Sequence, residues 1–177
     1  EVRALSTVFK GTYLYDNDAN EANLKRISQE EPSSVIHLAM HGWVDAESPQ
    51  YSCLVLSHVH DDVEDNLLHA YELNLLKLKA DLVVLSACET GFGKYERGEG
   101  VVRIGRGFMY AGIPSLVMTL WPINDQATAS LMSNFYEELS KGKSKSESMR
   151  QAKLNYIEAA SPVSAHPFFW ASFMTLG

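Results

Sequence analysis

Short apolar runs recur along the chain and are separated by stretches of mixed polarity. The runs are rich in Val, Leu and Ile, and none of them alternates cleanly with polar residues; they cover residues 35–40, 54–56, 82–85 and 115–120. Strands that are buried on both faces have this pattern, because helices cover both sides of a parallel sheet. We therefore predict strands of a mostly parallel sheet at these places.

Amphipathic stretches between and after these runs predict helices. Apolar residues recur at helical spacing over 99–111 and over 126–139, where Asn124 or Asp125 can cap the N-terminus. Ser144 begins a capping box at the start of a further helix. Strands that alternate with helices in this way predict an α/β sandwich.

Both ends of the chain predict shorter elements. A strand at 12–15 is expected to lead into a helix that Asp18 caps and that ends near Glu30. Near the C-terminus, Pro167 and the apolar run 168–174 predict a last buried strand.

Composition narrows the class of protein. The chain has 177 residues, of which 46% are hydrophobic and 21% charged, and this length and mixture fit one globular domain. The net charge of −7 argues against an electrostatically driven nucleic-acid binder. No apolar run approaches the roughly 18 residues of a membrane helix. Only two cysteines are present, so we expect free thiols in a reducing compartment, which predicts a cytoplasmic protein.

Two predicted strands end in residues that can do chemistry. The run 35–40 is followed by His41 and Gly42, and the run 82–85 is followed within three residues by Cys88. Parallel strands place these ends at one edge of the sheet. A cysteine nucleophile needs a nearby base, and an imidazole is the usual one. His41 and Cys88 are therefore a candidate dyad.

Simpler interpretations stand beside this one. Most free cysteines are small buried hydrophobes, so Cys88 can be one, and Cys53 is most simply part of the core. The alternating histidines of 58–62 resemble a metal-binding strand, but that segment fits the tip of an acidic, solvated hairpin better, and we expect no metal or cofactor. The sequence has no Gly-x-Ser-x-Gly elbow and no phosphate-binding loop.

Several motifs in one order give the chain a family resemblance. The chain resembles the CHAT domain, a branch of the caspase-like cysteine peptidases related to separase, from about residue 32 to residue 177. The segments that carry the resemblance are 37–42 (HLAMHG), 85–91 (LSACETG), 99–100 (EG) with 107–112 (GFMYAG), 120–125 (LWPIND) and 167–173 (PFFWASF).

The resemblance implies a three-layer αβα sandwich of caspase type and a His/Cys dyad peptidase. His41 would be the general acid/base and Cys88 the nucleophile that forms a thioester acyl-enzyme. The backbone N–H groups of Gly42 and Cys88 would bind the oxyanion. In related enzymes that cleave after arginine or lysine, an acidic residue often stands two positions before the cysteine, where this chain has Ser86.

That departure weakens the expectation of a basic P1 residue. We expect Ser86, Asp125 and Asp45 to contact substrate. Asp125 is our candidate for an acidic wall of the substrate pocket, with Asp45 as a weaker one, although Asp125 can equally be a helix cap. The loop 92–98 follows the candidate nucleophile, and we expect it to gate access to the site.

Two functions remain open at this point. The first is a cysteine endopeptidase that cleaves proteins and is activated by a partner or a fused TPR-like sensor domain, in bacterial defence or cell death. The second is a caspase-like scaffold that binds protein partners and does not cut. The chain starts at Glu1 with no secretory signal, so we expect residues 1–177 to be one domain from the C-terminal part of a longer protein.

Overall fold

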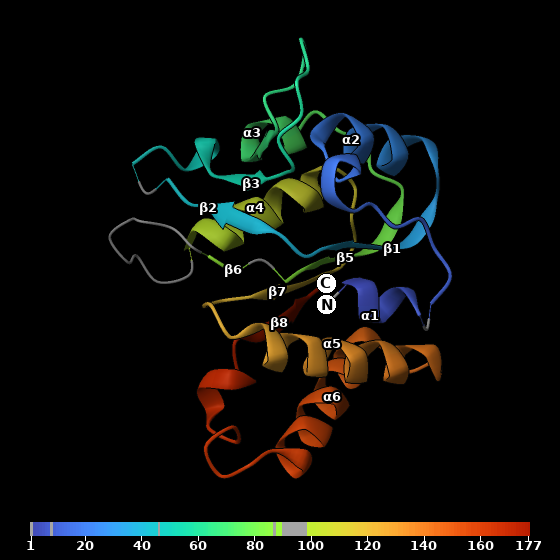
Figure 1. The fold of residues 1–177 in the computed structure, drawn as a ribbon, viewed down its shortest axis with the longest axis vertical. Helices are drawn as coiled ribbons and strands as arrows, with labels where there is room; N and C mark the ends of the chain where they lie inside the picture. The colour runs from blue at the N-terminus through green and yellow to red at the C-terminus, as the bar shows by residue number, and fades with distance from the viewer. Residues whose placement is uncertain (1, 8, 46, 87, 90–98) are drawn as a thin grey trace.

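The computed structural model describes residues 2–7, 9–45, 47–86, 88–89 and 99–177, with the backbone alone at Ala4, Cys88, Glu89 and 99–103. The fold is mixed α/β, with one mostly parallel sheet, a second smaller sheet, and helices around them (Figure 1). In the part of the chain that the structure describes, no helix is both long and apolar enough to cross a membrane.

The first sheet, sheet A, has the strand order β1-β5-β7-β8. Its first three strands are β1 (Ser33–Leu38), β5 (Ala80–Leu85) and β7 (Leu116–Thr119), and they run parallel. The last strand, β8 (Phe173–Leu176), pairs antiparallel with β7. Three of the apolar runs in the sequence therefore form the parallel part of sheet A, as predicted.

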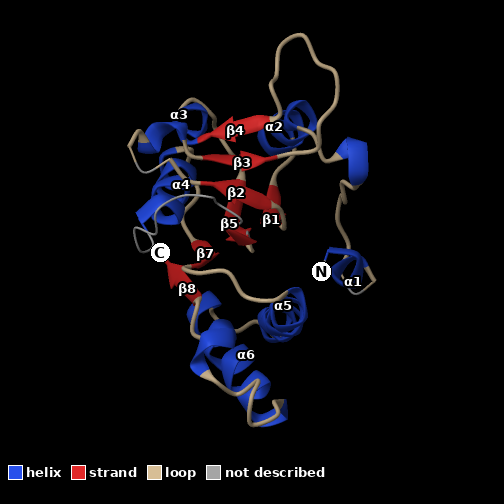
Figure 2. Cartoon of the chain, turned by 60° about the vertical axis from the view of Figure 1, so that its left-hand side comes forward, coloured by secondary structure: helices blue, strands red, loops and turns tan. Residues whose placement is uncertain are grey.

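The second sheet, sheet B, has the order β4-β3-β2-β6, and Figure 2 shows its strands β4, β3 and β2 side by side. The strands β2 (His41–Trp43), β3 (Cys53–Val55) and β4 (Leu67–His69) pair antiparallel, whereas β6 (Cys88–Glu89) runs parallel to β2. The run at 54–56 thus forms a strand, but our prediction that it joins a parallel sheet is wrong. With two antiparallel neighbours, it belongs to a meander instead.

Six α-helices appear among the described residues. They are α1 (Val2–Ser6), α2 (Glu21–Glu30), α3 (Ala70–Leu73), α4 (Glu99–Tyr110), α5 (Asp125–Ser140) and α6 (Lys145–Ala159). Helices α5 and α6 pack against one face of sheet A, while α4 and sheet B lie on the other side (Figure 1).

Successive residues of the central strands face two different cores. Along β5, Val83 and Leu85 belong to the core that includes α4 and sheet B, while Leu82 and Val84 belong to the core that α5 and α6 cover. All four are at most 1% exposed. Both faces of the strand are dry, and this is why its sequence shows no polar alternation.

The helix caps were predicted with mixed success. Asn124 caps α5 by accepting a hydrogen bond from Ala127 N at 2.8 Å, and Ser144 caps α6 as predicted. Helix α2 ends at Glu30 as expected, but its cap is Asn20 and not Asp18. Asp18 lies in a 3-10 turn (Asp16–Asp18) that precedes the helix.

Both terminal strand predictions need correction. Residues 12–15 form no strand and run beside sheet A without pairing to it. The apolar run 168–174 starts as a 3-10 helix (Pro167–Phe169), because proline at its start supplies no backbone donor for a ladder. The strand begins only at Phe173.

Candidate functional site

The candidate site lies where the chain crosses from sheet A to sheet B. Strand β1 ends at Leu38 and the chain enters β2 at His41; in the same way, β5 ends at Leu85 and the chain enters β6 at Cys88. The strands β2 and β6 pair in parallel, and the Cα register sets His41 opposite Cys88 and Gly42 opposite Glu89. The two candidate residues therefore occupy facing positions on neighbouring strands, about 4.8 Å apart in the hydrogen-bonding direction.

The two faces of sheet B differ, although the outer one is open only in part, because Cys53, which the register sets opposite Trp43, is fully buried. On its inner face, Leu54 and Leu68 are each 1% exposed and pack into the core with α4. On its outer face, His41 is exposed and lies opposite Val55, which is 39% exposed. Trp43, two residues after His41 on the same face, is 44% exposed. The candidate base thus shares an accessible, largely apolar surface that sequence reasoning missed.

The other cysteine is in a different environment. Cys53 is fully buried in β3 and forms no disulfide. Burial raises the pKa of its thiol to about 11, and the carboxylates of Asp65, Glu21 and Glu72 add to this shift. A thiol with so high a pKa is almost entirely protonated at neutral pH and is a poor nucleophile. The expectation that Cys53 belongs to the core is confirmed.

The three residues expected to bind substrate lie in different settings. Asp125 is exposed at the first position of α5, on the loop after β7. Because Asn124 is the cap of that helix, capping does not occupy the Asp125 carboxylate. Asp45 follows β2, and its Oδ1 accepts from Glu47 N and Ser48 N at 3.0 and 2.8 Å.

Ser86 is the most enclosed of the three. It is 5% exposed, and its hydroxyl lies 3.3 Å from Nε2 of His37. The other ring nitrogen of His37, Nδ1, lies 2.7 Å from the hydroxyl of Tyr136 on α5. Sequence reasoning gave neither His37 nor Tyr136 a role. The histidine was visible in the HLAMHG segment, but its partner stands 99 positions away.

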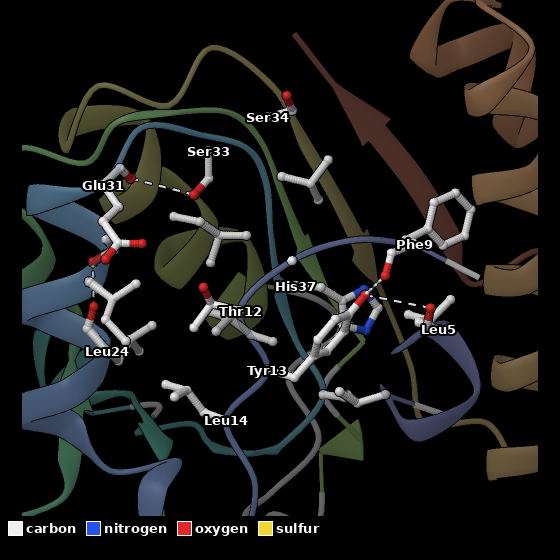
Figure 3. A pocket seen from close by; sticks show the side chains of 18 of the residues that line it. Leu5, Phe9, Thr12, Tyr13, Leu14, Leu24, Glu31, Ser33, Ser34 and His37 are labelled. Atoms are coloured by element: carbon white, nitrogen blue, oxygen red, sulfur yellow. Dashed lines mark hydrogen bonds between the residues drawn. The ribbon is translucent and has the colours of Figure 1, made fainter. Parts of the chain in front are cut away.

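A cavity of about 680 Å³ opens beside this group of side chains (Figure 3). It lies between β1, α2, α5 and the N-terminal segment, by which we mean residues 2–7 and 9–14. The lining of the cavity is mainly apolar. His37 and Tyr136 form part of its wall, together with Phe9 and Tyr13 of the N-terminal segment. The Tyr13 hydroxyl donates to Phe9 O at 2.9 Å, and this bond holds the segment in a turn.

Three carboxylates that could hold a metal ion gather elsewhere, where α2 meets the connection between β3 and β4 and the start of α3. Glu21, Glu64 and Glu72 have oxygens within 4.8 Å of one another. Lys25 lies among them, with its Nζ at 2.6–2.8 Å from each residue. Its ammonium already occupies the position that a cation would take, so this group is a partly buried ion-pair cluster.

The carboxylate of Glu21 is the least well compensated charge in this cluster. Glu21 is 1% exposed, and burial raises the pKa of its carboxyl even though Lys25 opposes the shift. Its oxygen Oε2 has no hydrogen-bond partner among the described residues. Burial works to lower the pKa of Lys25, but the hydrogen bonds that its ammonium donates to the three glutamates outweigh burial, raise the pKa and keep Lys25 charged.

The loop 92–98, which we expect to gate access, lies outside the described residues, as does the side chain of Cys88.

Comparison with known proteins gives one family and two curated relatives. The family model for the CHAT domain matches residues 1–177. Tetratricopeptide repeat protein 28 of Mus musculus is 32% identical over 111 residues, and that of Homo sapiens is 30% identical over 115 residues. These matches cover 63% and 65% of this chain but 4% of each relative. The chain thus spans a small part of the length of the relatives it matches.

Proposed function

The chain belongs to the CHAT domain family, and we propose that it is a cysteine endopeptidase in which Cys88 is the nucleophile and His41 the general acid/base. The observation that carries the proposal is the register between β2 and β6, which sets these two residues opposite each other. The exposure of His41 adds to it, because a general base must reach the substrate.

The proposed reaction has two stages. The Cys88 thiolate attacks the carbonyl carbon of a peptide bond, and backbone N–H groups of Gly42 and Cys88 stabilise the oxyanion. His41 gives its proton to the leaving amine as the C–N bond breaks, which leaves a thioester on Cys88. His41 then takes a proton from water, the water oxygen attacks the thioester, and the acid product leaves as the thiol is restored.

The outer face of sheet B is the natural place for substrate near this dyad. Trp43 and Val55 offer an apolar surface beside His41, and a peptide side chain laid there buries apolar area. Asp125 and Asp45 remain our candidates for acidic contacts to substrate. Ser86 is buried against His37, so its contribution to a substrate pocket would be indirect, through the position of the chain that leads to Cys88.

We propose further that the domain works within a longer protein. The two curated relatives are tetratricopeptide repeat proteins, which supports a fused or associated TPR-like sensor that controls the dyad. Residues 1–177 would then be a single catalytic domain with the fold of a caspase-like three-layer αβα sandwich. This domain would lie in the C-terminal part of the longer protein. A cytoplasmic location and a role in bacterial defence or cell death are proposals carried by the family resemblance.

The decisive experiment compares two matched cysteine variants. Cys88→Ala and Cys53→Ala each remove one thiol, and both are assayed against a peptide library and a proteome digest, alone and in the full-length protein. We expect cleavage to vanish in Cys88→Ala and to persist in Cys53→Ala. Equal cleavage by wild type and Cys88→Ala would contradict the proposal. No cleavage by any form, with an unreactive Cys88, would favour a scaffold that binds partners without cutting.

A further inference from the structure

A chain of side-chain hydrogen bonds ends two positions before the candidate nucleophile. It runs from the Tyr136 hydroxyl to Nδ1 of His37 at 2.7 Å, and from Nε2 of His37 to the Ser86 hydroxyl at 3.3 Å. We propose that Tyr136 and His37 are positioning residues: they hold Ser86, and with it the start of the segment that leads to Cys88, in one place beside β1. This inference rests on the proposed function, since it concerns how the same Cys88 is placed.

Ser86 is tied to β1 at two points. Its side chain meets His37, and its backbone N–H donates to Leu38 O at 3.2 Å. Strand β1 is also the strand from which the chain continues to His41. Strand β1 therefore helps to place both residues of the proposed dyad. His41 follows the end of β1 by three positions in the chain, and Cys88 follows Ser86, which is hydrogen-bonded to β1. A shift of Ser86 along β1 would move Cys88 out of register with His41.

Because these side chains are buried, the hydrogen bonds between them restrict how the side chains can be arranged. Ser86 is 5% exposed and Tyr136 is 7% exposed, so neither hydroxyl can exchange its partner freely for bulk water. A buried polar group that loses its partner pays the cost of desolvation without compensation. The three side chains therefore favour one arrangement.

The hydrogen-bonding capacity of the three groups suits a continuous chain. A neutral imidazole has one N–H donor and one acceptor nitrogen, and a hydroxyl can be either. If Tyr136 donates to Nδ1, His37 donates from Nε2 to Ser86; in the other tautomer both directions reverse. Either way no buried charge is needed, and the chain of hydrogen bonds links α5 to Ser86 at the end of β5.

The outer end of this chain contacts the N-terminal segment. The ring of Phe9 packs on that of Tyr136 with 5.4 Å between centroids, and the two residues share the wall of the cavity in Figure 3. A displacement of this segment would therefore reach Tyr136 first and Ser86 through His37. The candidate dyad has in this way a physical connection to the N-terminal segment.

Two tyrosines allow a matched test. Tyr136→Phe removes the hydroxyl that begins the chain and keeps the ring, while Tyr156→Phe does the same to a buried tyrosine of α6 in the same core. Amide hydrogen exchange is measured for the peptide that covers residues 85–89, together with the thermal unfolding of each variant. We expect exchange in that peptide to become about two- to ten-fold faster in Tyr136→Phe and to stay at the wild-type rate in Tyr156→Phe.

A second readout separates positioning from general loosening. The iodoacetamide reaction of Cys88 is followed from pH 6 to 9, and we expect its rate at pH 7 to fall about two- to ten-fold in Tyr136→Phe, with the midpoint of the pH profile moved upward. Unchanged exchange at residues 85–89, or equal effects of the two tyrosine variants, would overturn the inference. A wild-type Cys88 that reacts no faster than Cys53 would contradict the proposed function, while the exchange data would still decide this inference.

Discussion

The two sheets of this molecule are stabilised by different physics. Sheet A is a dry layer whose central residues, such as Val83, Val84 and Val117, are completely buried between apolar groups. Sheet B buries one apolar face, and the partly buried ammonium of Lys25 ties the β3–β4 connection and α3 to α2. Its other face carries the exposed His41. The comparison sets a fully buried framework beside a smaller sheet that has an exposed side.

The largest effect should come from the framework. Phe135→Ala empties a fully buried ring position in the core between sheet A and α5, and we expect it to lower the free energy of unfolding by about 3–5 kcal/mol. Chemical denaturation followed by circular dichroism measures this loss. Leu154→Ala on the half-exposed side of α6 is the control and should cost far less. Similar losses in the two variants would mean that sheet A is not the framework we describe.

The next effect tests how sheet B is held. Lys25→Met leaves three glutamates close together without their cation, and we expect a loss of about 3 kcal/mol at pH 7. Lowering the pH should recover part of it, because the carboxylates then become neutral. Lys141→Met removes an ammonium that also bridges two glutamates but is half exposed, and it should cost at most about 1 kcal/mol. If Lys25→Met lost no more stability than Lys141→Met, the Lys25 cluster would not be what holds sheet B to α2.

The open face of sheet B gives a smaller, functional effect. Trp43→Ala truncates the exposed ring beside His41, and we expect KM for peptide substrates to rise about three- to ten-fold with kcat little changed, since the loss is one of binding area. Steady-state kinetics measure both constants. Leu154→Ala, equally exposed but on the far side of sheet A, should leave KM unchanged. A fall in kcat with constant KM would instead assign Trp43 to the chemical step.

The smallest effect is a difference in pH dependence between two glutamates. Burial raises the pKa of Glu21, so the stability that its protonated form contributes is lost as the pH rises above the ordinary value of 4.5. Hydrogen bonds from Lys141 and Lys143 lower the pKa of Glu138, so its contribution is present above 4.5 and is lost as the pH falls through the lowered value.

Matched glutamine variants expose this opposition. With rising pH, Glu21→Gln should gain stability relative to wild type, whereas Glu138→Gln should lose it. Denaturation curves from pH 3 to 8 measure both differences. If the stability differences of the two variants changed with pH in the same direction, the Lys25 cluster would compensate the charge of Glu21 fully. That result would contradict the structure, in which Oε2 of Glu21 has no hydrogen-bond partner among the described residues.

The sequence predicted sheet A far better than sheet B, and the reason is physical. A strand buried on two faces, such as 82–85, has a composition that few other elements share. A strand of three residues is too short to show a period of polar and apolar positions. The run 54–56 could therefore be predicted as a strand, but its antiparallel pairing could not. The short polar stretch at 17–20 holds several residues able to cap a helix, and only the fold selects Asn20.

The candidate site was predicted in part. His41 and Cys88 could be proposed because each follows an apolar run, and their facing register agrees with that reasoning. The contacts around them could not be predicted, because they join distant parts of the chain: Lys25 meets Glu72 across 47 positions and His37 meets Tyr136 across 99. No local pattern encodes such pairs.

The most direct test of the central claim is the relative reactivity of the two cysteines. Iodoacetamide labelling at pH 7, quantified by mass spectrometry for each site, is compared between wild type and His41→Ala. If His41 and Cys88 form a dyad, Cys88 reacts much faster than the buried Cys53, and His41→Ala removes most of that advantage. Equal labelling of Cys88 with and without His41 would contradict the account.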